Sequence, residues 1–277
     1  MPKGRDPART EKFFSERKTL FRGVVRNAHL IGNRIGQRQT EDLRIRGSWL
    51  FMRASITAHS ITQLFDPAPT GFGKFVYLDH PSIAVLCRAL IENIAVLLYI
   101  SDTTISADEW QCRMHLVDLH DFVNRQAFIS RIPYTSTMKN PEKLFAELQS
   151  RVADNAFFKT LAVRTQKRLL EGEEMFLYGR HNAMLKLGWG EDLTRGIYKY
   201  LSNQAHSLAM SFHRTQANNA YEQGSTYAKV VAGFSAEFGY KALGVGCLRM
   251  LELFPDTELA FEPAVLTAFK KEYTPTP

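Results

Sequence analysis

The stretch Ser82–Ile100 reads SIAVLCRALIENIAVLLYI and is apolar nearly all the way round a helix. It is almost long enough to cross a bilayer, but Arg88 and Glu92 lie near its middle. Each charge would cost about 2.5–3.5 kcal/mol at the centre of a membrane helix. We therefore expect a central, buried helix of a soluble bundle and no membrane partner. The three widely spaced cysteines predict a reducing, cytoplasmic location.

The rest of the chain has the same helical character. Apolar residues recur at three- and four-residue spacing, and no alternating run with an Asn-Gly or Asp-Gly turn indicates a hairpin. Ser106 followed by Glu109 predicts a capping box, Asn140 before Pro141 predicts a helix start, and Ser82 is expected to cap the apolar helix. The predicted fold class is all-α, a single multi-helix bundle. Helices are expected at 10–31, 40–65, 82–100, 106–131, 141–153, 155–173, 191–215, 224–254 and 258–272.

Three other stretches have a distinct composition. Residues 66–81 (DPAPTGFGKFVYLDHP) predict a loop that packs its aromatic side chains on the bundle or closes over something. Residues 132–140 (IPYTSTMKN) are polar and are expected to be exposed. Small residues at four-residue spacing permit close helix contact within the bundle or between two subunits. These are Ala228, Ala232, Ala236 and Gly244.

Composition excludes several classes of protein. With 45% apolar and 23% charged residues, the chain is that of a globular protein rather than a disordered one. The three cysteines form no C-x-x-C pair, and the charged beginning of the chain has no secretory pattern. The sequence contains no Walker-type loop, no G-x-G-x-x-G after a strand and no H-E-x-x-H. We therefore expect no cofactor and no metal.

Positive charge is concentrated near the start of the chain. Residues 1–53 hold 13 Lys and Arg against 5 Asp and Glu, whereas residues 54–277 hold 22 against 23. Lys18, Arg22 and Arg26 recur every four residues and would form one basic stripe on a helix. Such a stripe suits nucleic acid, an anionic lipid surface or an acidic protein, or is a solvated helix face. We expect a basic helical extension over 1–36 and a helical bundle domain over 37–277.

Polar residues inside the apolar helices are candidates for a site. Arg88 and Glu92 are about 40° apart round their helix and must be paired if buried, either as a structural lock or as the floor of a site. In the helix expected at 191–215, Tyr198, Ser202 and His206 form a polar stripe at four-residue spacing. A histidine whose tautomer is fixed by a neighbour can act as a base near neutral pH.

The Arg-x-x-x-Glu and Tyr-x-x-x-Ser-x-x-x-His motifs of residues 80–213 resemble a family of uncharacterised bacterial helical proteins. That family is similar to the HEPN superfamily of helical bundles, which includes toxin and antiphage ribonucleases. The resemblance implies a HEPN-like core with additional N- and C-terminal helices, in which Arg88, Glu92, Ser202 and His206 converge. It implies no established activity.

The chain departs from the pattern of active HEPN ribonucleases, which is an arginine followed by four to six residues and a histidine. Three pairs have this spacing, a number that chance alone nearly supplies. The best candidate within a single helix is Arg113 with His120, although an exposed amphipathic helix explains the same residues. The pairs are Arg22 with His29, Arg53 with His59, and Arg113 with His120.

These observations leave three hypotheses. The first is a bacterial defence or toxin-type protein that binds or cleaves RNA without a metal. In it His206 would be the acid or base, assisted by Tyr198, Arg88 would hold a phosphate, and Glu92 and Ser202 would orient those groups. The second is a non-catalytic interaction module, in which the same set locks the core and the basic helix docks an acidic partner. The third is a small-molecule sensor with a cavity beneath residues 72–77. A homodimer is compatible with the small-residue ladder.

Overall fold

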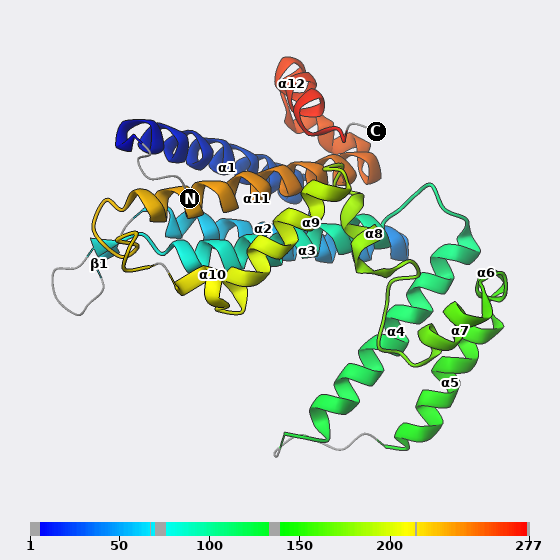
Figure 1. The fold of residues 1–277 in the computed structure, drawn as a ribbon. Coiled ribbons are helices and arrows are strands. Elements are labelled where there is room, and N and C mark those ends of the chain that lie inside the picture. Colours follow the sequence, from blue (N-terminus) through cyan, green and yellow to red (C-terminus); the bar gives the residue numbers. More distant parts are fainter. Residues whose placement is uncertain (1–5, 67, 70–75, 133–138, 214, 276–277) are drawn as a thin grey trace. The chain divides into compact units, whose positions relative to one another are not determined.

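The computed structural model describes residues 6–66, 68–69, 76–132, 139–213 and 215–275, and within them the chain is almost entirely helical (Figure 1). The predicted all-α class is therefore confirmed. A short antiparallel ribbon pairs β1 (Ala68–Pro69) with β2 (Val76–Tyr77). The chain forms two compact units, Met1–Ser101 with Met184–Pro277, and Asp102–Ala183.

The expected boundary after residue 36 does not coincide with this division. The first helix, α1 (Pro7–Ile35), contributes Phe14, Phe21 and Ile31 to the buried core of the first unit. It packs along α11 (Thr226–Leu253), far away in the sequence. The basic segment is therefore part of the core and not an extension, because its apolar face needs a partner helix.

The apolar helix α3 (His80–Ile100) is covered by other helices of the first unit. It packs against α2 (Asp42–Leu64), α9 (Glu191–Ala205) and α11. By length and hydropathy α3 is the one helix of the described residues that could cross a membrane, but 61% of its most apolar window is buried inside the protein. This burial is typical of the core helix of a soluble protein.

Small residues of α11 allow the neighbouring helices to approach it. Ala228, Ala232, Ala236 and Gly244 are all buried within the unit. A Cβ atom added at Gly244 would lie within 2.7 Å of the Tyr273 ring, in α12 (Pro263–Tyr273). The ladder therefore serves contacts inside the chain, and it gives no support to the expected homodimer, which stays a prediction.

The second unit has a core of its own. Apolar side chains of α4 (Ala107–Ile129) pack against α5 (Pro141–Asp154) and the short helices that follow it. Its buried guanidinium, Arg113, lies 2.6 Å from a Glu109 carboxylate oxygen and 3.7 Å from one of Asp102.

The remaining helices are α6 (Ala156–Lys159), α7 (Val163–Leu170), α8 (Gly179–Leu185), α10 (Ala209–Phe212) and η1 (Pro255–Ala260).

Two expected helices are shorter than predicted. The helix expected at 191–215 ends at Ala205, because Ser207 adopts a left-handed backbone conformation with φ 49°. The helix expected at 155–173 is interrupted after Lys159, where the Gln166 side chain donates to backbone carbonyls of the preceding turn. The expected helix at 258–272 is a 3₁₀ turn followed by α12, and α8 was not predicted.

The predicted caps are confirmed in part. Ser106 Oγ accepts a hydrogen bond from the Glu109 amide at 3.1 Å. The cap of α3 is Asp79 rather than Ser82, whose amide donates to the Asp79 carboxylate. Asn140 precedes its helix without a side-chain cap hydrogen bond. Most of the aromatic stretch 72–77 and of the polar stretch 132–140 lies outside the described residues.

Substitution of two helical glycines by alanine is expected to change the free energy of unfolding in opposite directions. A Cβ atom at Gly239 of α11 would lie 2.9 Å from a carbon of the fully buried Phe21 ring and 3.0 Å from the Cys87 sulfur, whereas one at Gly23 of α1 meets nothing within 4 Å. We expect Gly239→Ala to lower the free energy of unfolding by about 1–3 kcal/mol through overpacking. Gly23→Ala should raise it by about 0.5–1 kcal/mol. Urea unfolding measures both, and an equal effect of the two substitutions would contradict this packing.

Candidate functional site

Of the four polar residues predicted to converge, Arg88, Glu92 and His206 come together, whereas Ser202 makes no side-chain hydrogen bond among the described residues. The Arg88 Nε donates to Glu92 at 3.2 Å, and its Nη2 donates to the Tyr198 hydroxyl at 3.2 Å. The Arg88 Nη1 lies 3.0 Å from the His206 Nε2. The guanidinium also lies over the Tyr198 ring, 5.1 Å from its centroid. We call Arg88, Glu92, Tyr198, Ser202 and His206 the Arg88 cluster.

The hydrogen bond to His206 fixes the role of one ring nitrogen. A guanidinium only donates hydrogen bonds, so the His206 Nε2 is the acceptor in this contact. His206 is exposed and lies at the C-cap of α9, not inside a helix as expected. The arginine is only 14% exposed. Three of its five N–H donors are already in use, which leaves two donors for a phosphate on a mostly buried side chain.

Ser202 is the member of the cluster without a partner. Its hydroxyl oxygen is buried, and among the described residues it makes no hydrogen bond. It therefore does not orient Arg88 or His206 in this structure. Taken together, these contacts attach the end of α9 to the middle of α3, which is the arrangement that a structural lock requires.

Two of the three basic side chains in the stripe of α1 are already paired with a carboxylate. Asp66, just beyond the end of α2, accepts hydrogen bonds from Lys18 at 3.1 Å and from Arg22 at 2.7 Å. Those two bonds lower the pKa of the Asp66 carboxyl. Arg26 is exposed and has no ion pair among the residues that the structure describes. Three positive charges thus face one negative charge, which leaves a net charge of +2 along the stripe.

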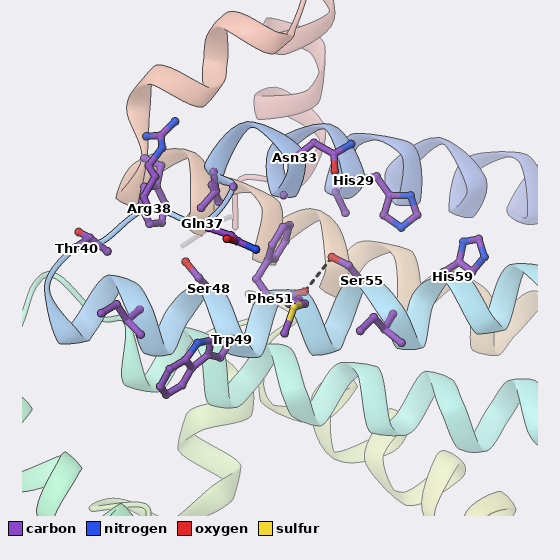
Figure 2. A pocket seen from close by; sticks show the side chains of 18 of the residues that line it. His29, Asn33, Gln37, Arg38, Thr40, Ser48, Trp49, Phe51, Ser55 and His59 are labelled. Atoms are coloured by element: carbon purple, nitrogen blue, oxygen red, sulfur yellow. Dashed lines mark hydrogen bonds between the residues drawn. The ribbon is translucent and has the colours of Figure 1, made fainter.

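The stripe borders a hollow between α1 and α2. Figure 2 shows His29 of α1 and His59 of α2 pointing toward one another, and their ring centroids are 5.6 Å apart. The hollow has a volume of about 510 Å³. We call it the basic hollow; it is lined by Thr19, Arg22, Val25, Arg26, His29, His59 and Thr62.

His29 and His59 are the histidines of two of the arginine–histidine pairs noted in the sequence, Arg22 with His29 and Arg53 with His59. Neither spacing rises above chance, and only the packing of α1 against α2 brings His29 and His59 together. The pair of Arg113 with His120 is less suitable as a phosphate-binding or catalytic pair, because Arg113 is buried between two carboxylates. Burial and the nearby Arg180 lower the pKa of His120 despite Asp121.

The other reactive side chains give no site. Burial raises the pKa of the Cys112 thiol to about 12, and Cys87 and Cys247 are buried with raised pKa values. Such thiols are inert. Within the described part of the chain, no group of three or more His, Cys, Asp or Glu side chains could hold a metal ion.

Comparisons with family models, with curated proteins and with solved structures gave no significant match. The resemblance to HEPN-like bundles therefore stays a prediction.

The Arg88 cluster predicts a specific loss of stability. Arg88→Ala removes hydrogen bonds from a charged, mostly buried donor, and we expect the free energy of unfolding to fall by about 2 kcal/mol. Arg195→Ala is the control, because Arg195 is 65% exposed and forms a surface pair with Glu191. Its effect should stay within about 0.5 kcal/mol. Urea unfolding of both variants measures the difference, and equal, small losses would show that the cluster does not stabilise the fold.

Proposed function

We propose that this protein binds single-stranded RNA by its phosphates in the basic hollow. The observation that carries the proposal is that Arg22, Arg26 and His29 of α1 line one hollow together with His59 of α2. Arginine is suited to phosphate because its planar guanidinium donates several hydrogen bonds in a fixed geometry. Thr19 and Thr62 line the same hollow, but their hydroxyls already donate to the Ser15 and His59 carbonyls, so the arginines are the donors left for phosphate oxygens.

The charge of the hollow supports an anionic ligand. Arg22 and Arg26 line the hollow, Arg22 is paired with Asp66, and Arg26 has no competing carboxylate among the described residues. The hollow is open and most of its lining surface is apolar, so Arg22 and Arg26 are the groups that would hold phosphate there. The resemblance to RNA-acting helical bundles favours RNA among polyanions, and a setting in bacterial defence rests on that resemblance alone.

Three substitutions test this binding. We expect Arg26→Ala to weaken binding of a fluorescein-labelled twelve-residue oligouridylate about 2–5-fold, as for an exposed ionic contact. The slope of log K against log salt should fall by about 0.7. Asp66→Asn should strengthen binding, because it releases Lys18 and Arg22. Arg195→Ala removes the same charge far from the hollow in sequence and should change little.

Fluorescence anisotropy over a range of salt concentrations measures all three variants. Equal effects of Arg26→Ala and Arg195→Ala would mean that only net charge matters. A loss of affinity in Asp66→Asn would likewise contradict the proposal.

A second candidate function, RNA cleavage, is favoured by the His29–His59 pair. One imidazole would take the proton of the 2′-hydroxyl while O2′ forms a bond to phosphorus and the bond from phosphorus to O5′ breaks. The other, protonated imidazole would give its proton to O5′. The products are a 2′,3′-cyclic phosphate and a 5′-hydroxyl. Two positioned histidines can supply such acid and base catalysis without a metal.

We expect His29→Ala and His59→Ala each to lower the rate of oligouridylate cleavage in EDTA by about 100-fold or more. Both variants should still bind a 2′-O-methyl oligomer, which cannot be cleaved. His213→Ala changes an exposed histidine outside the hollow and should leave cleavage unchanged. Binding without cleavage by the wild-type protein would reduce the function to RNA binding. Cleavage that survives both substitutions would exclude these histidines as the acid and base.

A further inference from the structure

Three large apolar side chains of α2 are unusually exposed. Trp49, Met52 and Ile56 have exposed fractions of 61%, 58% and 61%. Their spacing places them on one side of the helix. They line a hollow of about 750 Å³ between α1 and α2, which is also lined by Gly32 and Gly36 and shares His29 and His59 with the basic hollow. We call Trp49, Met52 and Ile56 the α2 stripe. Contiguous exposed apolar side chains mark surfaces that bind another molecule.

Positive charges flank the α2 stripe. Arg46 and Arg53 are seven residues apart and follow one edge of the stripe. Neither forms an ion pair among the described residues. The beginning of the chain supplies a large positive excess, 13 Lys and Arg against 5 Asp and Glu in residues 1–53. An apolar stripe with a basic border is complementary to an apolar stripe with an acidic border.

We infer that the α2 stripe docks an acidic amphipathic helix of a partner protein. The partner would present apolar side chains at three- and four-residue spacing to Trp49, Met52 and Ile56, and Asp or Glu to Arg46 and Arg53. A second copy of this chain would place Arg46 and Arg53 close to like charges, which opposes self-association. RNA would use Trp49 for base stacking but would gain little from Met52 and Ile56. This inference does not depend on the proposed RNA binding.

The test uses a designed eighteen-residue helical peptide with a leucine stripe and glutamates along both borders. Its control is the same peptide with lysines in place of the glutamates. We expect the acidic peptide to bind the full-length protein at least about tenfold more tightly than the basic one. Binding should shift the emission of Trp49 to shorter wavelength, and Trp49→Phe should abolish that shift.

Two substitutions locate the contact. Met52→Ser with Ile56→Ser should weaken binding of the acidic peptide about tenfold, as expected for residues at the centre of an interface. Leu259→Ser is the matched control, because Leu259 is 78% exposed in η1, outside the stripe. Both target residues are mostly exposed, so the variant should keep its melting temperature, which circular dichroism checks.

Several results would overturn the inference. One is failure of the acidic peptide to bind at 100-fold excess over micromolar protein, or equal binding of both peptides. Another is equal weakening by Leu259→Ser. Sedimentation showing a dimer that Ile56→Glu dissociates would assign the α2 stripe to a second copy instead. A stripe variant that loses oligouridylate binding while no peptide binds would assign it to RNA.

Discussion

The burial of a charge within the apolar helix α3 is the constraint on which the rest of the structure depends. Arg88 cannot be left alone in that environment, because an unpaired buried charge costs several kcal/mol. The chain meets this requirement with Glu92 on the same helix and with Tyr198 and His206 from α9. These contacts explain why α9 packs on α3. They also use the groups that would otherwise be the strongest candidates for a site.

As a consequence, the polar side chains that are accessible to a ligand lie elsewhere in the protein. The helix α1 is held by α11 over most of its length, whereas its side toward α2 contains two hollows. The basic hollow carries Arg22 and Arg26, the other hollow carries the α2 stripe, and His29 and His59 line both. Both sets of side chains project from helices whose opposite faces are buried in the core. The core therefore positions these surface groups on rigid elements, as a binding site requires.

The sequence was most informative where burial decides the outcome. The apolar α3 and the all-α class could be predicted, because an apolar helix must be covered and its charges must be paired. The convergence of Arg88, Glu92, Ser202 and His206 was implied only by the resemblance, and Ser202 makes no side-chain hydrogen bond among the described residues. The end of α9 at Ala205 could not be predicted, since only the left-handed Ser207 stops that helix. The pairing of His29 with His59 was also missed. It arises from the packing of α1 against α2, and neither histidine has a distinctive neighbourhood in the sequence.

The central claim is that ligands meet the basic hollow and not the Arg88 cluster. The most direct test is NMR of the histidine ring signals, which number eight in this chain, during titration with an oligouridylate. Single substitutions assign the signals of His29, His59 and His206. Our account predicts that the signals of His29 and His59 shift together and saturate at one RNA concentration, while that of His206 stays in place. A shift of His206 with His29 and His59 unchanged would contradict it and return the site to the Arg88 cluster.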